Sequence, residues 1–131
     1  MIALDTNALV RFLVRDDKAQ ARMAKALVDG LGDGDGRGYV SDVVLCELVW
    51  VLTRSYRFDR RRIAEVLQRL VAARQLAFGS TEAIARAVSA YEQGKGDFAD
   101  YMIREHARDA GCESIATFDR DLLGDDMFSM P

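Results

Sequence analysis

The chain has few of the residues that build disulfide frameworks or zinc sites. It contains two cysteines, Cys46 and Cys112, which are far apart in the sequence, and a single histidine, His106. A zinc site made only of Cys and His needs four such ligands, so the chain is not a structural zinc protein. Two distant cysteines in apolar surroundings are expected to be buried free thiols in a reducing compartment.

Long apolar runs are also missing. Residues 1–5 have neither the basic start nor the apolar stretch of a signal peptide. The longest apolar run, residues 43–52, is interrupted by Glu47 and is about half as long as a membrane span. We therefore expect a cytoplasmic protein with no membrane partner. The 131 residues suffice for one domain with a hydrophobic core.

Lysine is scarce, although the chain holds 18 basic residues and has a net charge of −3. A negative net charge argues against a nucleic-acid partner at first. However, 15 of the basic residues are arginines, which bind phosphate in a bidentate way better than lysine does. Bound metal ions would also offset the negative charge of the acids that hold them. Net charge alone therefore does not decide the partner.

Short apolar stretches that suit strands alternate with longer helical patterns. The strand patterns cover residues 1–4, 39–41, 76–78, 114–118 and 127–130. The helical patterns cover about 6–13, 18–31, 42–56, 60–71, 80–93 and 98–110, and residues 30–38 form a glycine-rich loop. This alternation predicts an α/β fold with a mainly parallel sheet.

Two aspartates directly follow strand patterns. Asp5 comes after residues 1–4, and Asp119 comes after residues 114–118. Asp5 could simply cap the helix that begins after it. Ligands in parallel sheets, however, bind at the carboxyl ends of strands. Two such strands in one sheet would bring both acids to the same edge.

Glu47 is the one charged residue among residues 43–52. A helix that is apolar on nearly every face is expected to be mostly buried. A buried glutamate needs an arginine partner, a metal ion, or a raised pKa that keeps it neutral. An ion pair with one of the arginines and a role as metal ligand both remain open.

Two further aspartates stand at the start of the helix expected at residues 98–110. Asp97 is expected to cap this helix. Asp100 lies one turn further on, beside Ile103 on the expected core side. Its alternative to a ligand role is a surface ion pair with Arg104.

Four of these acids together favour a metal site: Asp5, Glu47, Asp100 and Asp119. Like charges in one place repel unless a cation neutralises them. Carboxylates without Cys or His select hard cations such as Mg²⁺ or Mn²⁺. Such an ion activates water and stabilises charge on a phosphoryl group. The pattern therefore favours hydrolysis of phosphodiester bonds.

These segments resemble the PIN-domain ribonucleases and, within them, the VapC-type toxins of bacterial toxin–antitoxin pairs. The matching segments are residues 4–9, 45–52, 97–103 and 117–122, in the same order and with similar spacing. The resemblance covers essentially the whole chain. It implies a single PIN-like domain over residues 1–131, with a three-layer α/β/α sandwich and a short, mainly parallel sheet.

The resemblance also implies an activity and partners. It implies an Mg²⁺- or Mn²⁺-dependent endoribonuclease that acts as the toxin of a toxin–antitoxin pair. All four acids carry over as catalytic and metal-binding residues, with Asp5 and Asp100 as the most direct ligands. Supporting roles are carried over to Asn7, Asp97 and Thr117. The implied partners are an RNA substrate, a cognate antitoxin that inserts a basic segment into the acidic groove, and a second copy in a homodimer.

Two other functions are alternatives to this one. A haloacid-dehalogenase-like phosphatase with Asp5 as nucleophile needs a second Asp two positions on, where this chain has Asn7. A non-catalytic RNA- or protein-binding module with the same fold is the alternative that an assay must decide. Tyr101 also departs from the family, which often has a small residue there, and this could reshape the rim of the pocket.

Five arginines surround one helix junction: Arg54, Arg57, Arg60, Arg61 and Arg62. They could guide an RNA backbone toward the acids, or form a solvated charged face with ion pairs at the helix ends. His106 is expected on a helix surface. No glycine-rich phosphate loop follows a strand, so no nucleotide cofactor is expected.

Overall fold

The structure is a computed structural model that describes residues 1–131. The chain divides into two compact units. Unit 1 consists of Met1–Asp59 and Arg69–Gly79, and unit 2 of Arg60–Gln68 and Ser80–Pro131. Helix α4 (Arg60–Ala72) contributes residues to both units. The helices and parallel strands confirm the α/β class predicted from the sequence.

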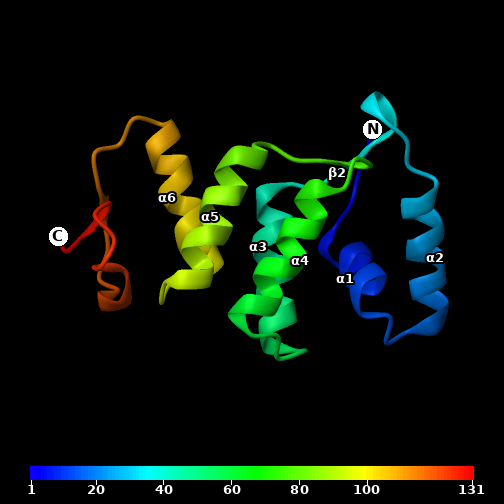
Figure 1. The fold of residues 1–131 in the computed structure, drawn as a ribbon, viewed down its shortest axis with the longest axis horizontal. Helices are drawn as coiled ribbons and strands as arrows, with labels where there is room; N and C mark the ends of the chain where they lie inside the picture. Colours follow the sequence, from blue (N-terminus) through cyan, green and yellow to red (C-terminus); the bar gives the residue numbers. More distant parts are fainter. The chain divides into compact units, whose positions relative to one another are not determined.

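Unit 1 contains a three-stranded parallel sheet in the order β1 (Ile2–Ala3), β2 (Gly38–Tyr39), β3 (Leu76–Ala77). Its helices are α1 (Thr6–Val14), α2 (Lys18–Asp29) and α3 (Asp42–Arg54). Helix α1 packs against both α2 and α3 (Figure 1). Because parallel strands require crossover connections, helices join each strand to the next. The glycine-rich loop includes a 3₁₀ turn at Gly34–Gly36.

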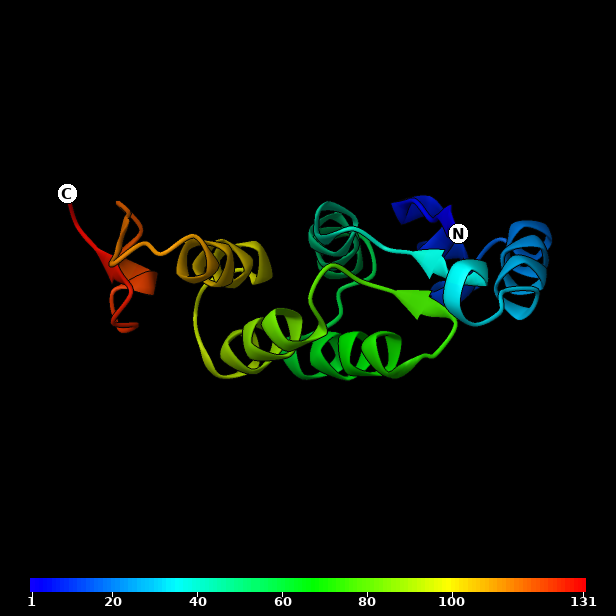
Figure 2. The same cartoon turned by 90° about the horizontal axis from the view of Figure 1, so that it is seen from above.

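Unit 2 contains the helix pair α5 (Thr81–Gln93) and α6 (Phe98–Asp109) and a two-stranded parallel sheet. That sheet pairs β4 (Ile115–Ala116) with β5 (Phe128–Ser129), and a 3₁₀ turn lies between them at Arg120–Leu122. Helices α5 and α6 lie side by side (Figures 1 and 2). Their core includes the rings of Tyr91 and Phe98, which meet edge to face at 6.2 Å.

The helix ends follow local chemistry that the sequence displays. The Ser80 hydroxyl accepts a hydrogen bond from the N–H of Ala83 and caps α5. Asp97 stands at the N-cap of α6, as predicted. Gly111 takes φ = +85°, the left-handed conformation in which glycine commonly ends a helix. None of the helices is both long and apolar enough to cross a membrane.

The two cysteines are free, but only one of them is sheltered. Cys46 is half-buried on α3, and burial raises the pKa of its thiol to about 11. Cys112 is exposed. The expectation of two buried thiols is therefore wrong for Cys112, because the chain has left α6 at Gly111 and no element covers the next residue.

Candidate active site

Asp5 stands at the junction of β1 and α1. Its Oδ1 atom accepts a hydrogen bond from the backbone N–H of Ala8 at 2.9 Å, so the capping role holds. The side chain is exposed. A cap uses one carboxylate oxygen, which leaves Oδ2 for another ligand. The same residue can therefore cap α1 and serve a metal site. Asn7 is also exposed, in the first turn of α1.

Glu47 lies on the exposed face of α3, so the prediction that it is buried is wrong. Only one stripe of this apolar helix is covered, and it consists of Leu45, Leu48, Val49 and Leu52. The other side carries Glu47 between Val43 and Trp50, whose exposed fractions are 69% and 59%. The hydroxyl of Thr6 donates to Glu47 Oε1 at 3.2 Å. The Glu47 carboxylate is thereby held at the start of α1, by the residue that directly follows Asp5.

Asp100 is half-buried in the first turn of α6. Its Oδ2 atom accepts a hydrogen bond from the Asp97 N–H at 2.8 Å. Burial raises the pKa of the Asp100 carboxyl, and the negative charges of Asp97 and Asp119 raise it further, against the lowering effect of the hydrogen bond. Surplus negative charge around one half-buried carboxylate is an environment that a cation would stabilise.

The alternative surroundings considered for Asp100 are not present. Arg104 pairs with Glu105 and Asp125 and not with Asp100. Ile103 is 53% exposed, so the expectation that it marks the core side is wrong. The buried face of α6 is instead formed by the residues near Tyr101 and Met102. Asp100 is therefore left without a cationic partner among the side chains.

Asp119 is exposed and lies three residues after the end of β4. Strand β4 pairs with β5 in a sheet separate from that of β1, so Asp5 and Asp119 do not stand at the edge of one sheet. The Thr117 hydroxyl accepts a hydrogen bond from the Asp119 N–H at 3.0 Å. The Asp119 carboxylate in turn accepts from the N–H of Asp121 at 3.0 Å. These two bonds fix the backbone and the side chain of Asp119. Thr117 therefore has an orienting contact of the kind expected of a supporting residue.

The turn between α5 and α6, residues 94–97, is held by Arg60, which was expected among the possible RNA contacts. Arg60 Nη1 donates to the carbonyl oxygens of Tyr91 at 2.8 Å and Gly96 at 2.7 Å. Its Nη2 donates to the carbonyl of Lys95 at 3.0 Å. The guanidinium lies 4.5 Å from the centre of the Tyr91 ring. Arg60 is thus engaged in structure and is not a free cation.

Tyr101 holds the same turn from another position. Its hydroxyl oxygen accepts a hydrogen bond from the Gly96 N–H at 3.1 Å. A Cβ added at Gly94 would lie 2.0 Å from this oxygen, and one added at Gly96 would lie 2.3 Å from Leu122 Cδ2. A Cβ at Gly94 would also lie 2.8 Å from the Ala90 carbonyl oxygen, so glycine is required there, whereas a Cβ at Gly96 would require the Leu122 side chain to move. The Tyr101 side chain occupies space beside the turn that a small residue would leave open.

A buried ion cluster lies beneath this region and was not predicted from the sequence. Glu105 is fully buried and accepts hydrogen bonds from Arg86 and, at 2.9 Å, from Arg104. Arg104 also pairs with Asp125 at 2.6 Å. Burial by itself would raise the pKa of Glu105, but the two arginines hold it below its usual value. The signal was present, because Glu105 continues the buried spacing of Phe98, Tyr101 and Met102.

The predicted ligands lie as one pair in each unit: Asp5 with Glu47, and Asp100 with Asp119. No group of three or more Asp, Glu, Cys or His side chains is placed to hold a metal ion. The donors are all carboxylate oxygens, which fit Mg²⁺ or Mn²⁺ and not softer metals. The charge around Asp100 agrees with that chemistry.

Two comparisons with known proteins bear on this arrangement. Residues 2–124 match the PIN domain family. Over 120 residues the chain is 24% identical to a VapC ribonuclease of Aquifex aeolicus (strain VF5), a match that covers 92% of this chain and 88% of that relative. The family match includes all four predicted acids and parts of both units.

Proposed function

Because this chain belongs to the PIN-domain family, we propose that it is an Mg²⁺- or Mn²⁺-dependent endoribonuclease that hydrolyses RNA phosphodiester bonds. The observation that carries the proposal is the surplus of negative charge at Asp100, which has the carboxylates of Asp97 and Asp119 near it and no arginine partner. The capping hydrogen bond from the Asp97 N–H gives Asp100 a structural role, but it does not neutralise the negative charges around this carboxylate. A bound cation would neutralise them.

We assign the metal-binding and catalytic roles to Asp5, Glu47, Asp100 and Asp119. Asp5 and Asp100 are the most direct ligands, and Glu47 and Asp119 complete the site. When bound, the ion supplies an activated water and stabilises charge on the phosphoryl group. Thr6 holds Glu47, Thr117 holds Asp119, and Asp97 holds Asp100 through hydrogen bonds. Asn7 supports the site from the first turn of α1.

We further infer that units 1 and 2 together form one PIN-like domain over residues 1–131, since the family match runs through both. The similarity to a VapC ribonuclease supports a role as the toxin of a toxin–antitoxin pair. The proposed partners are an RNA substrate, a cognate antitoxin and a second copy in a homodimer. The proposed location is the cytoplasm.

The proposal is tested by cleavage of a structured RNA pool with purified protein in Mg²⁺, Mn²⁺ or EDTA. Wild-type protein is expected to cut only with a divalent metal. Asp5→Asn and Asp100→Asn are expected to lose cutting while remaining folded, because asparagine keeps the oxygen that accepts the capping hydrogen bond in each case. Asp126→Asn, an exposed acid outside the site, is the matched control and should cut normally.

Four results would contradict the proposal. Cutting that persists in EDTA, or that survives both substitutions, would exclude the carboxylate site. Binding of RNA without cutting, by folded and antitoxin-free protein in either metal, would favour the non-catalytic binding module. Turnover of phosphomonoesters in place of RNA would favour a phosphatase.

A further inference from the structure

Unit 1 carries a small pocket with a basic lining. The pocket measures about 230 Å³ and lies between the end of α1 and the first turns of α2, two helices that pack side by side (Figure 1). Its one apolar lining residue, Ala21, is buried. The other lining residues, here called the α1–α2 basic face, are all exposed cations: Arg15, Lys18, Arg22 and Lys25.

The two acids next to this face in the sequence are engaged elsewhere. Asp16 accepts hydrogen bonds from Arg11 at 3.2 Å and from Tyr56 at 2.7 Å. Asp17 caps α2 by accepting from the N–H of Gln20 at 3.0 Å. Neither carboxylate forms an ion pair with a cation of the α1–α2 basic face.

The face therefore keeps most of its positive charge. Lys25 pairs with Asp29, but both side chains are more than half exposed, and such surface pairs are weak. The other three cations pair with no carboxylate. In a chain whose net charge is −3, this face reverses the overall charge and attracts anions.

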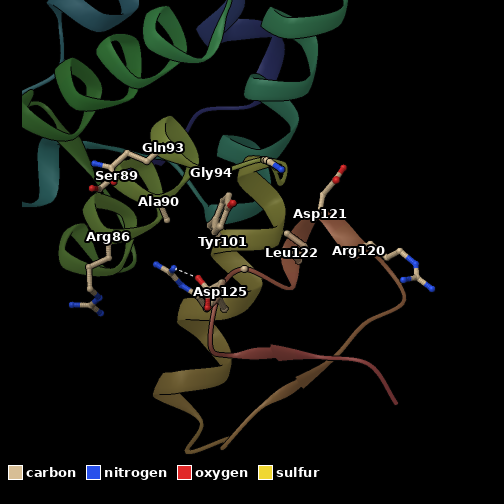
Figure 3. A pocket seen from close by; sticks show the side chains of 13 residues that line it. Arg86, Ser89, Ala90, Gln93, Gly94, Tyr101, Arg120, Asp121, Leu122 and Asp125 are labelled. Carbon is tan, nitrogen blue, oxygen red and sulfur yellow. Dashed lines mark hydrogen bonds and ion pairs between the residues drawn. The ribbon is translucent and has the colours of Figure 1, made fainter.

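The larger pocket of unit 2 is mixed in charge. It measures about 690 Å³, and both carboxylates and cations line it (Figure 3). Arg86 and Arg104 in its wall are bound to the buried Glu105, and Arg104 also pairs with Asp125. The α1–α2 basic face is therefore better suited to bind an anion.

Arg15 stands where the backbone favours glycine. It ends α1 with φ = +60° and ψ = +30°, the left-handed conformation. Glycine adopts this conformation without strain and commonly ends helices in this way, whereas a residue with a Cβ is strained there. The chain thus has a cation at this position at the expense of backbone strain.

The cations form a row that starts at the far end of α1 from Asp5. Lys18, Arg22 and Lys25 share one side of α2 and span about 10 Å of its axis. At about 3.4 Å per nucleotide, this length matches roughly three phosphates of a stacked strand. Asp5 caps the start of α1 and Arg15 ends it, so the helix separates them by about 15 Å.

We propose that the α1–α2 basic face binds the phosphate backbone of the RNA substrate at a distance from the bond that is cut. The inference rests on the proposed ribonuclease function, which supplies RNA as the ligand. Contacts to phosphates add affinity without reading the base sequence. A row of exposed cations fits RNA better than an acidic protein segment, because protein interfaces usually have an apolar centre and Ala21 is buried.

The first experiment measures RNA binding in EDTA, so that cleavage does not interfere. The probe is a fluorescein-labelled RNA of about 30 nucleotides, followed by anisotropy at several salt concentrations. The double variant Lys18→Gln/Arg22→Gln is expected to bind about tenfold more weakly than wild type, with a salt slope reduced by about 1.4 to 1.8 for two lost phosphate contacts. Arg69→Gln/Arg74→Gln removes two exposed charges elsewhere in unit 1 and should keep wild-type affinity. Unchanged affinity in the first variant, or an equal loss in both, would overturn the inference.

Arg15→Gly tests the same face without disturbing the fold. Glycine relieves the backbone strain, which offsets the larger entropy of the unfolded chain, so the thermal midpoint should stay within a few degrees of wild type. The RNA affinity is expected to fall about threefold. Arg57→Gly is the matched control, because Arg57 is exposed, has φ = +57° and lies outside the face. Unchanged affinity in Arg15→Gly, or the same loss in both glycine variants, would overturn the inference.

An acidic peptide distinguishes RNA from a protein partner. A fluorescein-labelled peptide of about ten glutamates has roughly the charge of a short RNA but no phosphates, and it is expected to bind wild type and the double variant equally weakly. Binding of this peptide that is tighter than that of RNA and is lost in the double variant would assign the face to an acidic protein segment instead.

Cleavage kinetics separate this inference from the proposed function. For the RNA of about 30 nucleotides, the double variant is expected to raise KM about tenfold with kcat within about threefold. For an RNA of about six nucleotides KM should not change, because each half reaches only roughly 10 Å from a bond cut at its middle. An unchanged KM for the long RNA would overturn the inference alone. Failure of wild type to cut would overturn the proposed function, whereas weaker RNA binding by the double variant in EDTA would still support the α1–α2 basic face.

Discussion

At the scale of single residues, Asp100 combines a structural contact with a charge that the fold disfavours. It accepts the hydrogen bond from Asp97 that begins α6. Burial and the nearby negative charges nevertheless raise its pKa above the ordinary 3.8. The folded protein then binds more protons than the unfolded chain between these two pKa values. The free energy of unfolding therefore falls as the pH rises through that interval and stays lower above it.

The variant Asp100→Asn should therefore separate stability from activity. Asparagine keeps the acceptor oxygen and removes the charge. In EDTA at pH 7 we expect its thermal midpoint to equal or exceed that of wild type by a few degrees, while metal-dependent cleavage is lost. Well below pH 3.8 the difference in midpoint should vanish, because the wild-type carboxyl is then protonated in both the folded and the unfolded state. Thermal scans at both pH values measure this, and a lower midpoint for the variant at pH 7 would contradict it.

Glu105 has the opposite relation to pH. Burial disfavours its charge, but Arg86 and Arg104 outweigh this and hold its pKa below 4.5. Its contribution to stability is therefore present above pH 4.5 and is lost as the pH falls through the pKa of the folded state. Since Glu105 is fully buried, removing its charge leaves Arg86 without its carboxylate partner and leaves Arg104 with Asp125 alone.

We expect Glu105→Gln to lower the free energy of unfolding at pH 7 by about 3 kcal/mol. This corresponds to a decrease of roughly 10 °C in the thermal midpoint. The difference from wild type should shrink in scans at pH 4 and below. Glu92→Gln, on the exposed side of α5, is the control and should stay within about 0.5 kcal/mol of wild type. A penalty that is independent of pH would assign the effect to packing instead of charge.

At the scale of elements, the position of the first turn of α6 depends on the turn that precedes it. Arg60 donates to the carbonyls of Tyr91, Lys95 and Gly96, and Tyr101 accepts from the Gly96 N–H. Asp97 and Asp100 follow directly. Arg60 is therefore a positioning residue for the proposed metal site, although it belongs to α4 and touches no ligand.

We expect Arg60→Lys to weaken Mn²⁺ binding about tenfold, because lysine keeps the charge but loses the planar fork and the stacking on Tyr91. Free Mn²⁺ measured by EPR gives the affinity, and a thermal scan gives the stability. Arg61→Ala is the control, since Arg61 is exposed and pairs only with Glu65 at 3.5 Å. If Arg60→Lys lowers the thermal midpoint but leaves the Mn²⁺ affinity unchanged, Arg60 has a structural role only.

The helices show which structural features could be predicted from the sequence and which could not. Caps and periodicity are local, so the bounds of α5 and the cap at Asp97 were predicted. The side of α3 that is buried depends on the elements that pack against it, and the composition of the helix alone does not reveal that side. Glu47 was therefore expected inside and lies outside. The role of Arg60 requires contacts between residues far apart in sequence, and no local pattern reveals it.

At the scale of the whole molecule, the proposed site needs acids from both units. Asp5 and Glu47 belong to unit 1, and Asp100 and Asp119 belong to unit 2. Their order along the chain, together with the resemblance to a family, led to a prediction of one shared site. Each pair alone offers few ligands for an ion that prefers about six oxygen donors, some of which are waters.

The effect of Mn²⁺ on stability tests whether the four acids act together, as proposed. A ligand at about 100 times its Kd stabilises the folded state by about 2.7 kcal/mol. We expect wild type to gain this, and Asp5→Asn and Asp100→Asn each to lose most of it, although each substitution lies in a different unit. The double variant should lose no more than either single variant, since both remove the same bound ion. Asp35→Asn, an exposed acid in the 3₁₀ turn of unit 1, should gain as wild type does. In the contrary result, each single variant loses only part of the Mn²⁺ stabilisation and the double variant loses the sum of the two parts. That result would mean that the two pairs of acids bind separate ions, and the proposal of a single site would be wrong.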